Sequence, residues 1–87
     1  MEHRSLIQLA VLAVHRRNGG IATCLDFSLR LLDSSLLLDS MDLAEIVAEL
    51  ERYSGWSPMD NAVRPVTWGD FAVLLEARAD MGKKATE

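Results

Sequence analysis

The chain has 87 residues, of which 49% are apolar and 25% charged, and its formal net charge is −4. This length and composition predict one small globular domain over residues 1–87 and exclude a disordered chain. The acidic balance argues against a nucleic-acid partner, which needs a basic face, and the single Cys24 excludes an internal disulfide. A reducing, cytoplasmic location is therefore the simpler expectation.

The first expected element is a mostly buried helix over residues 5–18. Ser5 followed by Gln8 fits a capping box, and the Gly19-Gly20 pair supplies the glycine that closes a helix. The apolar residues of this helix are Leu6, Ile7, Leu9, Val11, Leu12 and Val14.

The apolar run at residues 6–14 is too short to span a membrane. It leads straight into His15, Arg16 and Arg17 with no small-residue cleavage pattern, so we do not expect a signal peptide either. We expect no membrane partner. Beside two arginines, His15 is expected to be solvated rather than catalytic.

Residues 19–38 show no clear helical or strand period and are expected to form a long loop. A connection of this length in a small domain is either functional or packed onto the core by its own apolar side chains, and the leucines favour the second. The residues Asp33-Ser34-Ser35 are expected to form a turn. Cys24 has no basic neighbour in the sequence that would favour its thiolate form. We therefore expect it to be a small buried apolar residue, as free cysteines usually are.

The clearest helical period lies at residues 40–53 and stops at the Ser54-Gly55 pair. Asp39 precedes it as the expected cap. The apolar positions follow the i, i+3, i+4, i+7 spacing of one helix face. They are Leu43, Ile46, Val47, Leu50 and, further along, Tyr53.

Two more helices complete the expected fold, an all-α four-helix bundle with three main helices and one short helix. The short helix is expected at residues 60–64, between a turn at residues 56–58 and Pro65. The last helix is expected at residues 67–80. No strand is expected.

A capping box of Thr67 and Asp70 is expected to start the last helix, and Gly82-Lys83-Lys84 to end it. The buried face of this helix is expected to consist of Phe71, Leu74, Leu75 and the aliphatic stem of Arg78.

The residues that enzymes use are scarce in this chain. With only His3, His15 and Cys24 there is no metal-ligand spacing, and no glycine-rich phosphate loop is present. A serine hydrolase is excluded for want of a base. We therefore expect neither catalytic residues nor a metal site.

The pair Asp39-Ser40 stands at the first turn of the strongest amphipathic helix. Asp39 can cap the free amides, which leaves Ser40 at the exposed start of the helix. A phosphodiester on Ser40 would lie near the positive end of the helix dipole, but another protein would have to attach it. Helix capping alone also explains both residues, and this alternative stays open.

The acidic excess of the chain gathers around the same helix. Residues 39–60 hold six acids and one base, a balance of −5, whereas the rest of the chain holds seven acids and eight bases, a balance of +1. Such a face is either a solvated helix surface or a docking surface that steers a basic partner to Ser40.

The run D-S-M-D-L-A-E-I-V-A-E-L-E at residues 39–51 resembles the signature of the acyl carrier protein family, in which D-S-L opens the second helix of a four-helix bundle. Gly55, Pro58 and V-T-W-G-D-F at residues 66–71 match further positions of that family at compatible spacing. The resemblance implies a carrier rather than an enzyme. Its Ser40 would receive a 4′-phosphopantetheine arm from coenzyme A and bear the cargo as a thioester.

The resemblance also implies roles for neighbouring residues. The positions that match the family's docking surface for basic partner enzymes are Asp39, Met41, Asp42, Glu45 and Glu51. The positions that match those facing a carried acyl chain are Ile46, Val47 and Leu50. The implied partners are a phosphopantetheinyl transferase and acyl or aminoacyl ligases or synthases, such as those of fatty acid biosynthesis, engaged by a monomer.

Several positions depart from the family's pattern. Leu37 stands where fatty-acid carriers usually have glycine, Met41 replaces leucine, and Pro65 interrupts a usually apolar position. Ala44 and Ala48 are smaller than usual. The leucine run before residue 39 is closer to carriers of D-alanine and other amino acids, so the cargo stays open. An alternative is an unmodified helical interaction domain that docks through the acidic face of residues 40–53.

Overall fold

A computed structural model describes residues 3–55, 59 and 63–85 of the chain. Within these residues the fold is all-helical and contains no strand. An isolated bridge joins Arg30 to Thr67. The elements are α1 (His3–Arg17), the short 3-10 helix η1 (Ser34–Leu36), α2 (Ser40–Ser54) and α3 (Trp68–Ala85).

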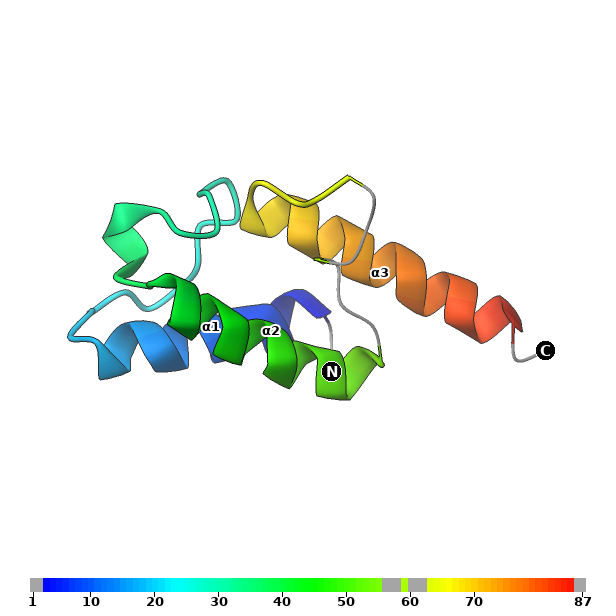
Figure 1. The fold of residues 1–87 in the computed structure, drawn as a ribbon, viewed down its shortest axis with the longest axis horizontal. Coiled ribbons are helices and arrows are strands. Elements are labelled where there is room, and N and C mark those ends of the chain that lie inside the picture. Colours follow the sequence, from blue (N-terminus) through cyan, green and yellow to red (C-terminus); the bar gives the residue numbers. More distant parts are fainter. Residues whose placement is uncertain (1–2, 56–58, 60–62, 86–87) are drawn as a thin grey trace.

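The helix α1 packs against both α2 and α3, and α3 extends beyond the other two helices toward the C-terminus (Figure 1). The all-α prediction is therefore confirmed, with three α-helices in the described residues rather than four. The predicted short helix at residues 60–64 and the turn at residues 56–58 lie largely outside the described residues.

The predicted boundaries of α2 agree closely with the structure. The helix begins at Ser40 and ends at Ser54, one residue later than expected. Gly55 follows with a left-handed φ of 75°, and its amide bonds back to the carbonyl of Glu51. This conformation ends α2, as the sequence predicts, because glycine adopts it without strain.

The predicted start of α3 is also confirmed. Asp70 N–H donates to Thr67 Oγ1 at 3.1 Å, and Thr67 N–H donates to Asp70 Oδ2 at 3.2 Å, which forms the expected capping box. The predicted end is wrong, because α3 runs through residues 82–84 to Ala85. A single glycine inside a helix costs only about 1 kcal/mol, and the lysines after it favour the helix.

The buried face of α3 is confirmed at Phe71 and Leu75, and Leu74 is half-buried. The side chain of Arg78 lies outside the described residues. The rings of Trp68 and Phe71 lie 5.5 Å apart with an interplanar angle of 55°, a tilted arrangement that aromatic pairs favour. The core residues with the largest fully buried side chains are Ile7, Val11, Ile46, Leu50, Trp68, Phe71 and Leu75.

The apolar stripe of α2 is buried at Ile46 and Leu50, but Tyr53 is 67% exposed. The ring of Tyr53 lines a pocket between α1 and α2, together with Leu6, instead of filling the core. Leu9 of α1 is similarly exposed, at 57%, although the other leucine, isoleucine and valine residues of α1 are buried or half-buried.

The predicted capping box of Ser5 and Gln8 is wrong. Because α1 already begins at His3, Ser5 lies inside its first turn. Gln8 Oε1 instead accepts a hydrogen bond from the amide of Leu25 at 3.0 Å. Gln8 therefore fastens the loop that follows α1 rather than the start of the helix.

The loop at residues 19–38 packs onto the core, as its leucines predict. Its buried residues are Leu25, Leu31 and Leu36. The turn expected at its end is the 3-10 helix η1, with Asp33 accepting hydrogen bonds from Ser35. Three backbone bonds hold the loop against the start of α3: Leu31 N–H to Val66 O, Trp68 N–H to Leu29 O and Gly69 N–H to Phe27 O.

His15 is buried, contrary to the expectation of a solvated ring, and is only 4% exposed. His15 lies eight residues after Ile7 and four after Val11, so it shares their buried face of α1. The neighbouring Arg16 and Arg17 are exposed. Nδ1 donates to the carbonyl of Leu36 at 2.8 Å, and Nε2 accepts from the amide of Ala22 at 3.1 Å. The ring therefore joins both ends of the loop to α1.

We expect His15→Ala to lower the free energy of unfolding by about 3 kcal/mol, because the change leaves a cavity and two unpaired backbone groups. Urea denaturation followed by circular dichroism measures this loss. Arg16→Ala, at the exposed neighbouring position, is the control and should change stability by less than about 0.5 kcal/mol. Equal losses in the two variants would contradict the role given to His15.

Candidate functional site at the start of α2

Ser40 is the first residue of α2, and its side chain is exposed. Asp39 caps the helix as predicted: its Oδ1 accepts from the amide of Asp42 at 2.8 Å, and Asp42 Oδ2 accepts from the amide of Asp39 at 3.2 Å. This capping box leaves the amides of Ser40 and Met41 without an acceptor among the described residues. An anionic group on Ser40 would lie beside these two free N–H groups.

The hydroxyl of Ser40 makes no hydrogen bond within the described part of the chain. His15, the buried histidine, uses both ring nitrogens on the loop backbone. No described side chain is thus placed to take a proton from Ser40.

Asp42, a predicted docking residue, is engaged within the protein. Its carboxylate accepts hydrogen bonds from Asn18 Nδ2 at 2.8 Å, from the amide of Asp39, and from Arg17 Nη2 at 3.1 Å. The Asn18 bond, followed by the Asp39 amide and then the charge of Arg17, holds the pKa of Asp42 below its ordinary value. Asp42 thus joins the end of α1 to the start of α2.

Arg17 also reaches a second predicted docking residue, Glu45, at 3.0 Å. The pair is half exposed, so it adds little stability, but it brings a positive charge onto the acidic face. Asp39 and Glu51 are exposed and make no ion pair with a described residue, and Met41 is 78% exposed. The acidic face is therefore less negative than the count over residues 39–60 implies.

An open groove of about 340 Å³ begins at Ser40 and runs along α2. Two alanines at one-turn spacing, Ala44 and Ala48, leave room along it. Among the residues predicted to face an acyl chain, Val47 lines this groove, whereas Ile46 lies in the core and Leu50 lines a different pocket. The full lining is Ser40, Leu43, Ala44, Val47, Ala48, Glu51 and Met59.

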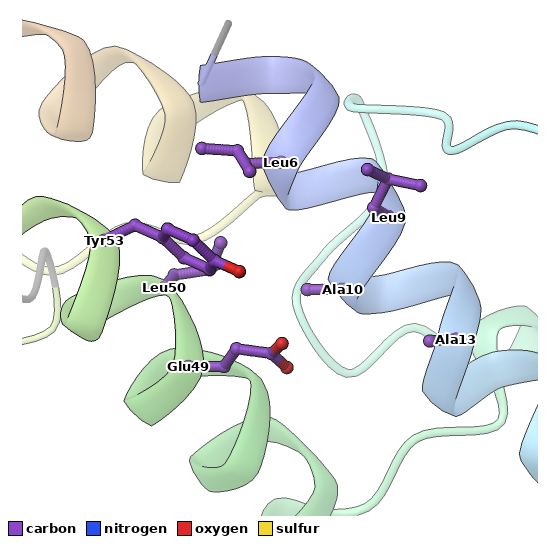
Figure 2. A pocket seen from close by; sticks show the side chains of 7 residues that line it. All are labelled: Leu6, Leu9, Ala10, Ala13, Glu49, Leu50 and Tyr53. Atoms are coloured by element: carbon purple, nitrogen blue, oxygen red, sulfur yellow. The ribbon is translucent and has the colours of Figure 1, made fainter. Parts of the chain in front are cut away.

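The pocket that Leu50 lines has a volume of about 270 Å³ and lies between α1 and α2 (Figure 2). The side chains of Glu49 and Tyr53 reach from α2 toward α1 there. The pocket takes Glu49, Leu50 and Tyr53 from α2, and none of these residues lines the groove at Ser40. This pocket is therefore separate from the groove at Ser40.

Other kinds of site find little support in the described residues. In residues 3–55, 59 and 63–85, no three or more His, Cys, Asp and Glu side chains gather as a metal site would require. None of the helices described combines the length and apolarity that a membrane crossing needs. Cys24, expected to be buried, is exposed.

Comparison with models of protein families, with curated proteins and with solved structures gives no match. The functional interpretation therefore depends on the residues around Ser40 and on their geometry.

Asp42→Asn should make the stability of the protein less sensitive to acid. Because the folded-state pKa of Asp42 lies below its ordinary value of 3.8, its carboxylate stabilises the fold above that value. This stabilisation is lost as the pH falls through the folded-state pKa. Urea midpoints measured from about pH 7 to about pH 3 should fall less steeply in the variant.

The same measurement on the wild-type protein is the reference. Both proteins also contain three further carboxyls with lowered pKa values, those of Asp26, Asp33 and Asp70. The difference between the two curves therefore gives the contribution of Asp42 to the pH dependence of stability. Parallel curves would show that Asp42 contributes no such stabilisation.

Proposed function

We propose that this chain is a carrier protein of the acyl carrier type, which bears a 4′-phosphopantetheine arm on Ser40 and presents acyl or aminoacyl intermediates as thioesters. The observation that carries the proposal is the exposed, unbonded hydroxyl of Ser40 at the capped start of a 15-residue helix. The resemblance of residues 39–51 to the carrier signature supports it.

The proposal includes the family's four-helix bundle, with the short helix at residues 60–64. It also includes a cytoplasmic, monomeric carrier that meets its partner enzymes one at a time. Such a carrier is not itself an enzyme.

Attachment of the arm is a phosphoryl transfer to Ser40. Oγ forms a bond to the phosphorus that carries the pantetheine group of coenzyme A, the bond from this phosphorus to the bridging oxygen breaks, and 3′,5′-ADP leaves. The hydroxyl proton passes to a base of the transferase. The resulting phosphodiester keeps one negative charge, which the free amides and the dipole at the start of α2 favour.

The groove beside Ser40 supports a place for the arm or its cargo. It begins at the attachment point, and Ala44, Val47 and Ala48 offer an apolar surface along α2. Its volume, about 340 Å³, falls at the lower end of the range of small-molecule sites in proteins. The exposed Asp39, Met41 and Glu51 support docking of a basic partner next to it.

Incubation with coenzyme A and a broad-range phosphopantetheinyl transferase should add one arm to the protein, as measured by intact mass. Ser40→Ala should abolish the addition. Ser34→Ala, which alters the exposed serine of the other Asp-Ser pair, is the matched control and should be modified like the wild type. A wild-type protein that gains no mass under conditions that modify a known carrier would refute the proposal.

The alternative, an unmodified interaction domain, is favoured by the capping box, which accounts for Asp39 without any modification. In that case partner binding would be indifferent to Ser40→Ala and weakened by reversing the charge of Glu45. Absence of arm attachment together with this pattern would favour the alternative.

Glu51→Gln should slow arm attachment more than Glu45→Gln. Glu45 is already paired with Arg17, whereas Glu51 has no ion-pair partner among the described residues and lines the groove at Ser40. Loss of Glu51 therefore removes attraction for a basic partner, and we expect kcat/KM for attachment to fall about threefold at low salt.

The salt dependence provides the control. Surface charges are screened at high ionic strength, so the difference between Glu51→Gln and the wild type should disappear near 1 M salt, where the Debye length is about 3 Å. A larger effect of Glu45→Gln, or an effect of Glu51→Gln that persists at high salt, would contradict this assignment.

A further inference from the structure

Leu37 has an unfavourable backbone conformation. Among the described residues it is the one non-glycine residue with a positive φ, at φ 60° and ψ 32°. Its amide bonds to the carbonyl of Ser34 at 3.3 Å, and its carbonyl accepts from Asn18 Nδ2 at 2.7 Å. Glycine or asparagine takes this left-handed conformation with less strain, so the turn itself gives no reason for a leucine.

Burial does not account for the leucine either. The side chain of Leu37 is 46% exposed, whereas that of its neighbour Leu36 is 4% exposed and belongs to the core. A strained residue persists where the surrounding structure holds it, and such residues concentrate at functional sites. The exposed half of the leucine side chain is therefore the part that needs an explanation.

The position of Leu37 beside Ser40 explains its exposed side chain. It lies three residues before Ser40, and Met41, directly after Ser40, is 78% exposed. Two exposed apolar side chains thus flank Ser40 in the sequence, next to the exposed carboxylate of Asp39, and the exposed Glu51 lines the groove that begins at Ser40. An apolar centre with a charged rim is the usual composition of a protein–protein interface.

We propose that Leu37 is a docking residue for the phosphopantetheinyl transferase, and that its side chain enters an apolar recess beside the basic patch of that enzyme. This inference rests on the proposed function of Ser40. The carboxylates of Asp39 and Glu51 select a basic partner, and Leu37 with Met41 adds apolar contact area. Asn18 and Ser34 hold the backbone of Leu37 by hydrogen bonds. Docking therefore costs little backbone conformational entropy at this residue.

Leu37→Asn and Leu37→Met test the proposal by the initial rate of arm attachment. Asparagine tolerates the left-handed conformation but removes the apolar contact, so kcat/KM should fall about fivefold. Methionine keeps an apolar side chain, and its rate should stay within about twofold of the wild type. The melting temperature of Leu37→Asn should equal or exceed that of the wild type, because the strain is reduced.

Leu9→Asn is the matched control. Leu9 is also an exposed leucine, at 57%, but it lines the pocket that faces the second half of α2. This variant should be modified at the wild-type rate.

Three results would overturn the proposal: an unchanged rate for Leu37→Asn, an equal loss for Leu37→Met, or a melting temperature of Leu37→Asn well below the wild type. The last would make Leu37 a packing residue. A wild-type protein that is never modified refutes the proposed function itself, which separates the two failures.

Discussion

The ring of His15 joins α1 to both ends of the loop that leads into α2, through Nδ1 to the carbonyl of Leu36 and Nε2 to the amide of Ala22. The first bond is buried and the second partly buried. An unpaired backbone group is costly in such places, so the two bonds hold the loop against the helix. Asn18, directly after the end of α1, bonds to the carbonyl of Leu37 and to Asp42. The last turn of α1 thereby sets where α2 begins, and with it the position of Ser40.

This support would suit the proposed attachment site, at which another enzyme performs the chemistry. The backbone around Ser40 is held by contacts from α1, while the hydroxyl itself stays exposed and unbonded among the described residues. A visiting enzyme would need only to supply the base and the donor molecule. Binding would be weak and reversible, since the surface offers few exposed charges and a small apolar contact.

The tertiary contacts also change the electrostatic character of that surface. Asp42 is used in the capping box and by Arg17 and Asn18, and Glu45 is paired with Arg17. Two exposed acids make no ion pair with a described residue: Asp39, which precedes Ser40, and Glu51, which lines the groove. Attraction of a basic partner would therefore come from these two positions rather than from a uniformly acidic helix.

Local patterns in the sequence determined the extent of α2 and the caps at Asp39 and Thr67, because each depends on bonds between residues three or four positions apart. The burial of His15 could also have been read from its spacing to Ile7 and Val11. Only the tertiary structure decided that Gln8 bonds to Leu25 and that Arg17 pairs with Glu45, since these partners lie 17 and 28 residues apart. Helical periodicity carries no information about which distant side chains meet; packing of the loop between α1 and α2 brings them together.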